Sequence, residues 1–131
     1  MNTTLWKLPV PVTSIIKGPS LKVLPKRQYE ISFSIEGTDG AEKMQALLFD
    51  EVEAFKCTYL KSLGSVNQDL SRQSYGAIIS VFDSSWLREV KQSYLDYCAS
   101  ARLTPRELQH LMITFDDGPC YEFICGAFDA A

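Results

Sequence analysis

Histidine, signature motifs and long apolar runs are nearly or wholly missing from this sequence. His110 is the only histidine among 131 residues. No P-loop, GxGxxG, GxSxG or HExxH pattern occurs, which excludes the common signatures of nucleotide binding, serine hydrolysis and zinc peptidases. No apolar run approaches the ~20 residues that cross a bilayer, and Pro9, Pro11, Thr13 and Ser14 interrupt the apolar N-terminal segment. The sequence predicts a cytoplasmic protein without a membrane helix or secretory signal.

The four cysteines do not have the spacing of a metal or redox motif. Cys57, Cys98, Cys120 and Cys125 form no CxxC pair. Cys120 and Cys125 are separated by an odd number of residues, which places them on opposite faces of an extended strand. They therefore do not share one metal ion or one disulfide unless a bulge intervenes. We predict reduced thiols that act as small core residues, and no cofactor; a zinc site or a disulfide is the alternative.

Charge is distributed unevenly along the chain. Residues 1–28 hold five of the 13 basic residues and no acid, so residues 29–131 hold eight bases and all 16 acids, a net charge of −8. An acidic body argues against nucleic acid as the main partner, because neutralising phosphates requires a basic surface. It is compatible with a basic protein partner.

The length of 131 residues predicts one domain, 1–131, with a proline-rich basic arm packed on an acidic body. Residues 1–28 contain four of the six prolines, which rule out a long helix or an interior strand. The same segment has ten large apolar residues, too many for a solvated tail. We predict an extended arm with short edge strands that is partly buried on the body; a docking arm for a partner is the alternative.

The sequence pattern of residues 29–131 predicts an α+β fold with a mostly antiparallel sheet of five to six strands. Alternation of apolar and polar residues indicates strands, whose expected ranges are 29–35, 43–49, 52–60, 75–82, 109–115 and 121–128. We expect 43–49 and 52–60 to form a hairpin, although a helix over 43–60 is conceivable. Residues 61–74 are predicted to be a polar loop.

One main helix is expected over residues 84–102. Asp83 or Ser84 can cap its first amides. Apolar residues recur at three- and four-residue steps and predict a buried stripe of Leu87, Val90, Tyr94, Tyr97, Cys98 and Ala101. Trp86 is expected to fasten the start of the helix to the sheet. Residues 104–107, Thr-Pro-Arg-Glu, match a capping box and predict one further helical turn.

The run Thr114-Phe-Asp-Asp-Gly-Pro119 resembles the first motif of the NodB-type polysaccharide deacetylases. The resemblance implies that Asp116 is a base and that Asp117 binds a catalytic metal. That family also needs a downstream pair of histidines, whereas His110 is single and lies upstream. Asp-Asp-Gly-Pro between two apolar runs is typical of a hairpin loop. We therefore predict a turn, with no metal and no catalytic residues in it.

His110 is expected to lie in a strand with Met112 and Thr114 on its own face. A hydrogen-bonded, half-buried histidine is the simplest interpretation; a general base is the alternative. A Cys–His dyad would need Cys120 or Cys125 in an exposed, electropositive setting, which a strand interior does not provide. A small-molecule binder or an enzyme with a site near His110 stays open as a hypothesis.

Residues 75–128 resemble small bacterial immunity-type proteins in layout: a strand, "DSSWL" opening a helix, then "LQHLMITFDDGPCYEFICGAF" as a hairpin. The resemblance implies a non-enzymatic protein that neutralises a cognate toxin by occluding it. We expect Asp50, Glu51, Asp116 and Asp117, the acids at the two predicted turns, to face that partner. A subunit or adaptor of a homo- or hetero-oligomeric assembly is the alternative function.

Overall fold

The computed structural model describes residues 3–8, 15–37, 39–59, 76–115 and 119–130. Within these ranges, nine strands form two antiparallel sheets, and one helix lies beside them. The predicted α+β class with one main helix is confirmed. The antiparallel strands number nine in the described residues and form two sheets, of five and four strands, where one sheet of five to six strands was expected.

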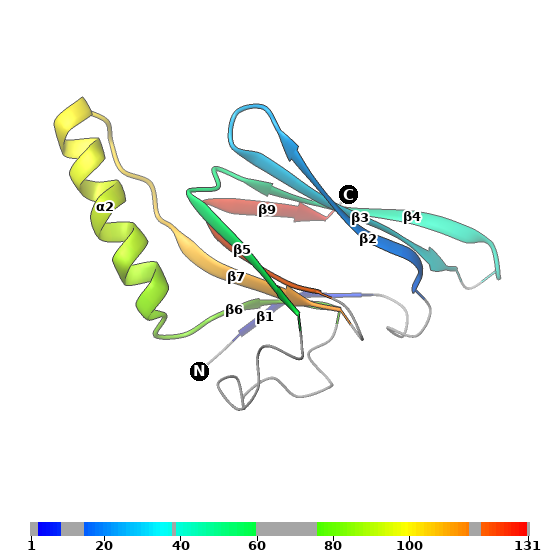
Figure 1. The fold of residues 1–131 in the computed structure, drawn as a ribbon. Helices are drawn as coiled ribbons and strands as arrows, with labels where there is room; N and C mark the ends of the chain where they lie inside the picture. Colours follow the sequence, from blue (N-terminus) through cyan, green and yellow to red (C-terminus); the bar gives the residue numbers. More distant parts are fainter. Residues whose placement is uncertain (1–2, 9–14, 38, 60–75, 116–118, 131) are drawn as a thin grey trace.

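The two sheets have separate strand orders (Figure 1). The five-stranded sheet runs β1 (Thr3–Lys7), β6 (Ala77–Ser80), β7 (Gln109–Thr114), β8 (Pro119–Cys125) and β5 (Ala54–Tyr59). The four-stranded sheet runs β2 (Ile15–Leu24), β3 (Gln28–Glu36), β4 (Glu42–Asp50) and β9 (Ala127–Ala130). The helix α2 (Ser85–Ala101) stands to one side and rests mainly on β7.

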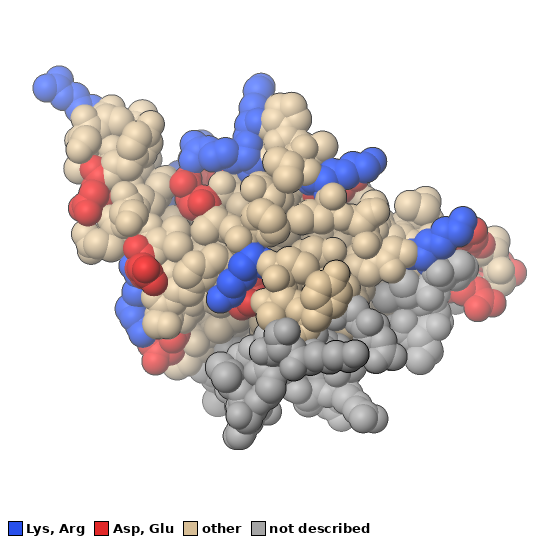
Figure 2. Space-filling view, viewed as in Figure 1, with Lys and Arg blue, Asp and Glu red and all other residues tan. Residues whose placement is uncertain are grey.

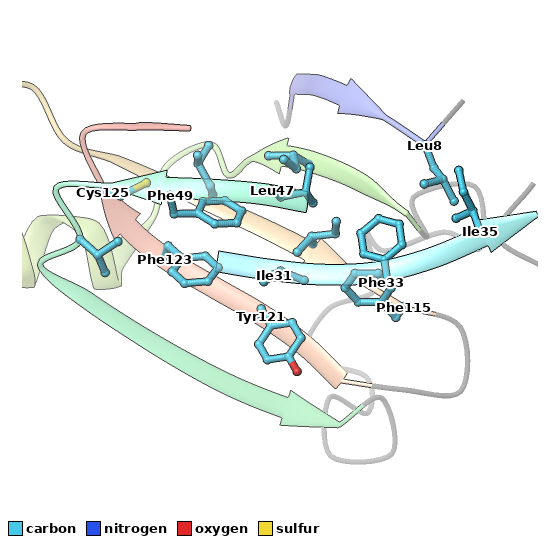
Figure 3. Close-up of a cluster of buried hydrophobic side chains, with 14 residues drawn as sticks. Leu8, Ile31, Phe33, Ile35, Leu47, Phe49, Phe115, Tyr121, Phe123 and Cys125 are labelled. Atoms are coloured by element: carbon cyan, nitrogen blue, oxygen red, sulfur yellow. The ribbon is translucent and has the colours of Figure 1, made fainter. Parts of the chain in front are cut away.

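The main core lies between the two sheets (Figure 3). Alternation along each strand sends every second side chain into it. The five-stranded sheet contributes Leu111, Ile113, Tyr121 and Phe123, among others. The rings of Phe49 and Phe123 stack across the two sheets with centroids 4.1 Å apart. Apolar burial of this kind makes the largest favourable contribution to the stability of a fold. The buried members of the cluster are Leu8, Ile31, Phe33, Ile35, Leu47, Phe49, Val52, Ile78, Leu111, Ile113, Phe115, Tyr121, Phe123 and Cys125.

The N-terminal segment supplies an edge strand to each sheet. β1 pairs with β6, and β2 pairs with β3. Pro19 lies within β2, where the pairing with β3 is irregular, as expected for a proline in an edge strand. A side chain at Gly18, whose φ is +107°, would collide with Phe33, so glycine is required at this point. Residues 9–14, which link β1 to β2, lie outside the described residues.

The predicted hairpin of 43–49 and 52–60 is wrong in its pairing. Both strands exist as β4 and β5, but they belong to different sheets. Between them the backbone of Val52 donates to the carbonyl of Arg27, and Glu51 has a left-handed φ of 54°. The side chain of Val52 enters the core. The chain therefore crosses from one sheet to the other where a hairpin was expected.

The last predicted strand, 121–128, is also divided. β8 ends at Cys125, and the chain changes sheet at Gly126 to form β9 beside β4. The amide of Gly126 donates to the carbonyls of Asp50 and Glu51, and a Cβ at this position would collide with the Glu51 side chain. The two crossings between sheets, at 51–53 and at 126, therefore lie side by side and depend on each other.

The predicted helix boundaries are confirmed within one residue at each end. Ser84 is the N-cap, and its hydroxyl accepts a hydrogen bond from the amide of Leu87 at 3.0 Å. The predicted stripe is only partly right. Cys98 is buried, but Tyr97 and Ala101 are exposed, because the helix rests on the sheet mainly along β7.

The predicted helical turn at 104–107 is wrong. Residues 103–108 run without helix back along α2 toward β7, and the amide of Arg106 donates to the hydroxyl of Tyr94 at 3.0 Å. The hairpin around Asp116 is confirmed by the pairing of β7 with β8 and by a hydrogen bond from the amide of Phe115 to the carbonyl of Pro119. Residues 116–118 themselves lie outside the described residues.

Candidate functional site

A set of three connected polar side chains lies on the outer face of the five-stranded sheet, under the start of α2. Ser84 comes from the helix N-cap, His110 from β7 and Glu122 from β8. His110 pairs in register with Ile124 and Met112 pairs with Glu122, so His110 and Glu122 are diagonal neighbours on the face away from the main core. The predicted face of His110, shared with Met112 and Thr114, is confirmed by this register.

Hydrogen-bond geometry fixes how the three groups are connected. The Ser84 Oγ lies 2.6 Å from His110 Nδ1, and His110 Nε2 lies 2.9 Å from Glu122 Oε1. In the neutral imidazole, Nε2–H donates to the Glu122 carboxylate, Nδ1 is the acceptor, and the Ser84 hydroxyl donates to it. The same Oγ accepts from the amide of Leu87. The serine hydroxyl and both ring nitrogens of the histidine therefore have partners.

Neighbouring side chains shield the three groups from solvent. Ser84, His110 and Glu122 are 8%, 5% and 7% exposed. The Trp86 ring meets His110 edge-on with centroids 5.1 Å apart. Lys56 Nζ lies 4.4 Å from the Trp86 ring centroid and 3.8 Å from Glu122 Oε2. Trp86 thus joins the helix to the sheet, as the sequence predicted.

The residue types match those of the serine–histidine–acid arrangement used in acyl transfer, in which histidine removes the serine proton. Two features suit these three residues to a structural role. The Ser84 hydroxyl is covered, and it holds the helix amide of Leu87. A covered hydroxyl that caps a helix is suited to fastening α2 to the sheet rather than to attacking a substrate. We call this set of three residues the Ser84 clamp.

Replacing Ser84 with alanine should lower the free energy of unfolding by about 2 kcal/mol, because it removes a helix cap and leaves His110 Nδ1 buried without a donor. Urea unfolding followed by circular dichroism measures this. Ser84→Thr keeps the hydroxyl and should lose less. Ser85→Ala, at the exposed next position, should change stability by less than about 0.5 kcal/mol. Equal losses at Ser84 and Ser85 would show that the clamp does not stabilise the helix.

A second feature lies beside the C-terminal half of α2. A groove of about 140 Å³ is lined by Arg27, Glu51, Glu53, Tyr94, Arg106 and Leu108. We call it the α2 groove. Two ion pairs cross it, Arg27 with Glu53 and Arg106 with Glu51. Figure 2 shows basic and acidic side chains close together beside the helix. The volume is below the roughly 300 Å³ of small-molecule sites and suits a single inserted side chain.

The four acids chosen from the sequence fall in different places. Glu51 lines the α2 groove, and Asp50 lies beside it, accepting from the Glu51 amide at 2.9 Å. Asp116 and Asp117 lie outside the described residues. The described residues next to them, Phe115 and Pro119, are bonded to each other where β8 begins. Gly126, whose amide donates to the carbonyl of Asp50, follows the other end of β8.

Several site residues were missed at the sequence level. Ser84 was recognised only as a cap, and Glu122 and Lys56 were not connected with His110. Their only available signal was strand parity, since His110 and Glu122 occupy the outward positions of two strands that form a hairpin. Arg27 and Arg106 carried no signal, because their pairing depends on where the loops fold.

The four cysteines are free thiols. Cys120 packs under the helix side of the sheet with Met112, whereas Cys125 belongs to the main core, so the predicted opposite faces are confirmed. Burial raises the pKa of Cys120 to about 11 and that of Cys125 to about 12. Cys57 is exposed, contrary to the expected core position, because β5 is at the sheet edge.

No group of three or more metal-ligating side chains is clustered in the part of the chain that the structure describes. Among these residues no helix has the length and apolarity to cross a membrane. Comparison of the chain with protein-family models, with curated proteins and with solved structures gave no match. Inference about function therefore starts from the residues of this chain.

Proposed function

We propose that this chain is a non-enzymatic, cytoplasmic protein of the immunity type, which binds a cognate toxin and neutralises it by occlusion. The α2 groove is the observation that supports the proposal. It places two arginines, two glutamates and a tyrosine around a hollow of side-chain size. Protein interfaces are enriched in such arginine and tyrosine residues, and a partner side chain that fills a pocket acts as an anchor.

The helix α2 also presents an exposed aromatic ring, that of Tyr97, three residues after the groove residue Tyr94. Trp86, Val90 and Tyr97 follow at helical spacing along one flank, and Trp86 contacts Lys56 of β5. Tyr97 lies further along this flank, near Tyr94, and is 60% exposed. An exposed tyrosine one helical turn from a residue that lines a charged hollow can add an apolar anchor to polar contacts, the usual composition of a binding surface.

Charge contributes through steering rather than through one large acidic area. Basic and acidic side chains alternate on the face shown in Figure 2. The groove glutamates are already paired with arginines, so a toxin must bring groups that exchange with these pairs. The net charge of −8 on residues 29–131 favours a basic toxin surface and faster association at low salt.

The test is co-expression with the product of the neighbouring gene, with rescue of growth as the readout. Tyr97→Ala should weaken binding about tenfold or more and reduce rescue, while the melting temperature stays within a few degrees because the ring is exposed. Charge reversal at Asp50, Glu51, Asp116 and Asp117 should slow association and reduce its dependence on salt.

The matched control is Met44→Ala, an exposed apolar residue on β4 six residues before Asp50. Those six residues correspond to about 20 Å of strand, so rescue should be unchanged. If no neighbouring product is toxic, or if rescue does not depend on Tyr97, the proposal fails. Covalent labelling of Ser84 by a fluorophosphonate would instead support an enzyme.

A further inference from the structure

β5 forms one edge of the five-stranded sheet in the part of the chain that the structure describes. It pairs with β8 through six consecutive residues without a shift in register. It contains no proline, and Lys56 is its only charged residue. Unpaired amides and carbonyls along such an edge are a template for another strand.

The other three sheet edges each have a feature that discourages pairing. β1 has a register shift between Thr4 and Trp6. β2 has two irregularities, contains Pro19 and carries Lys17 and Lys22. β9 has only four residues. Bulges, prolines, lysines and short length are the common means of blocking edge-to-edge association. Among the described edges, only β5 has none of these features except a single lysine, Lys56.

The side chains of β5 divide into two sets. Phe55 and Cys57 lie opposite Phe123 and Tyr121, so they share the core-facing side of the sheet with Tyr59. Phe55 and Tyr59 are 38% and 61% exposed, and Cys57 is also exposed. Lys56 and Thr58 point to the other side, where Lys56 meets Glu122 and Trp86. The core-facing side of this edge is thus apolar and uncharged.

We infer that β5 of a second copy of this chain pairs antiparallel with β5 of the first copy, about a two-fold axis. Opposite residues of an antiparallel pair lie on the same side of the sheet. In a two-fold symmetric pairing, one residue must therefore lie at the axis, directly opposite the same residue of the second copy; we call the pairing centred on that residue. Centring on Cys57 places Phe55 opposite Tyr59 of the second copy, and Lys56 opposite Thr58. Two aromatic pairs then form on the core-facing side, which favours cross-strand pairing.

Neighbouring registers are less favourable. Centring on Lys56 places two lysines directly opposite each other, which is destabilising. Centring on Thr58 places Tyr59 opposite Cys57 and leaves Phe55 without an aromatic partner. The Cys57-centred register therefore fits best, and it joins the two five-stranded sheets into one continuous sheet. This inference concerns the chain alone and does not rest on the proposed toxin partner.

The test is the mass of the purified chain in solution, by sedimentation and light scattering at micromolar to millimolar concentration. The expected species is a dimer of twice 14.7 kDa. Cys57→Lys places like charges at the two-fold axis and should weaken dimerisation about fivefold or more. Val23→Lys, at an exposed position on the blocked β2 edge, should leave the mass unchanged. Circular dichroism checks that both variants are folded.

Mild oxidation with copper–phenanthroline gives an independent result on the unmodified chain. Paired Cys57 residues at the axis come within disulfide range, while Cys98, Cys120 and Cys125 are buried. The expected product is a covalent dimer linked through Cys57, which Cys57→Thr abolishes. A monomer at all concentrations overturns the inference. A dimer that neither cross-links through Cys57 nor responds to Cys57→Lys overturns it too, because its interface lies elsewhere.

Discussion

Removal of residues 1–24 should give a protein that is insoluble or has no cooperative unfolding transition. The deletion takes away β1 and β2, one edge strand from each sheet. It removes Leu8 from the core together with Trp6 and Leu21, which pack against it. Burial of such side chains contributes roughly 1.5–3 kcal/mol each, and the backbone pairing of two strands is lost as well. The total approaches the stability of a typical domain, about 5–15 kcal/mol.

Thermal unfolding and solubility measure this effect, and two point variants in the same segment refine it. Leu8→Ala should cost about 2–4 kcal/mol, because Leu8 is buried. Leu5→Ala should cost less than about 1 kcal/mol, since Leu5 is exposed on β1. A soluble truncated protein with an unchanged melting temperature would show that the segment is a tail or a docking arm.

Replacement of Phe123 with alanine should lower the free energy of unfolding by about 4 kcal/mol. The ring is fully buried at the centre of β8, where it stacks on Phe49 and meets Tyr29 and Phe55. Its removal leaves a cavity between the sheets in addition to the lost transfer energy. Both sheets lose contacts, so one transition at lower urea concentration is expected.

Phe123→Leu is the matched control for this position. Leucine keeps most of the apolar volume, so its cost should be about half that of alanine or less. Near-equal losses for the two variants would mean that ring stacking dominates over volume. A loss below about 1 kcal/mol for Phe123→Ala would contradict the central place of this ring in the core.

The sequence alone determined the features that depend on near neighbours. Alternation from Tyr29 to Ile35 predicted β3, and the cap at Ser84 with apolar residues at helical steps predicted α2 within a residue at each end. The Asp-Asp-Gly-Pro run between two apolar segments predicted the β7–β8 hairpin. Strand parity also assigned His110 and the two cysteines of β8 to their faces. In each of these, the backbone preference of a few consecutive residues is sufficient.

The tertiary structure decided which strands are partners. β4 and β5 have the alternation of a hairpin, yet the buried Val52 and the crossing at Gly126 place them in separate sheets. Tyr97 has the spacing of a core residue and is exposed, because α2 rests on the sheet mainly along β7. The hydrogen bonds of His110 in the Ser84 clamp join residues 26 and 12 positions apart, and the ion pairs of the α2 groove join residues 26 and 55 positions apart. Local periodicity shows which side chains are apolar or polar, but the surface that covers them is supplied by distant parts of the chain, and only the folded structure brings these together.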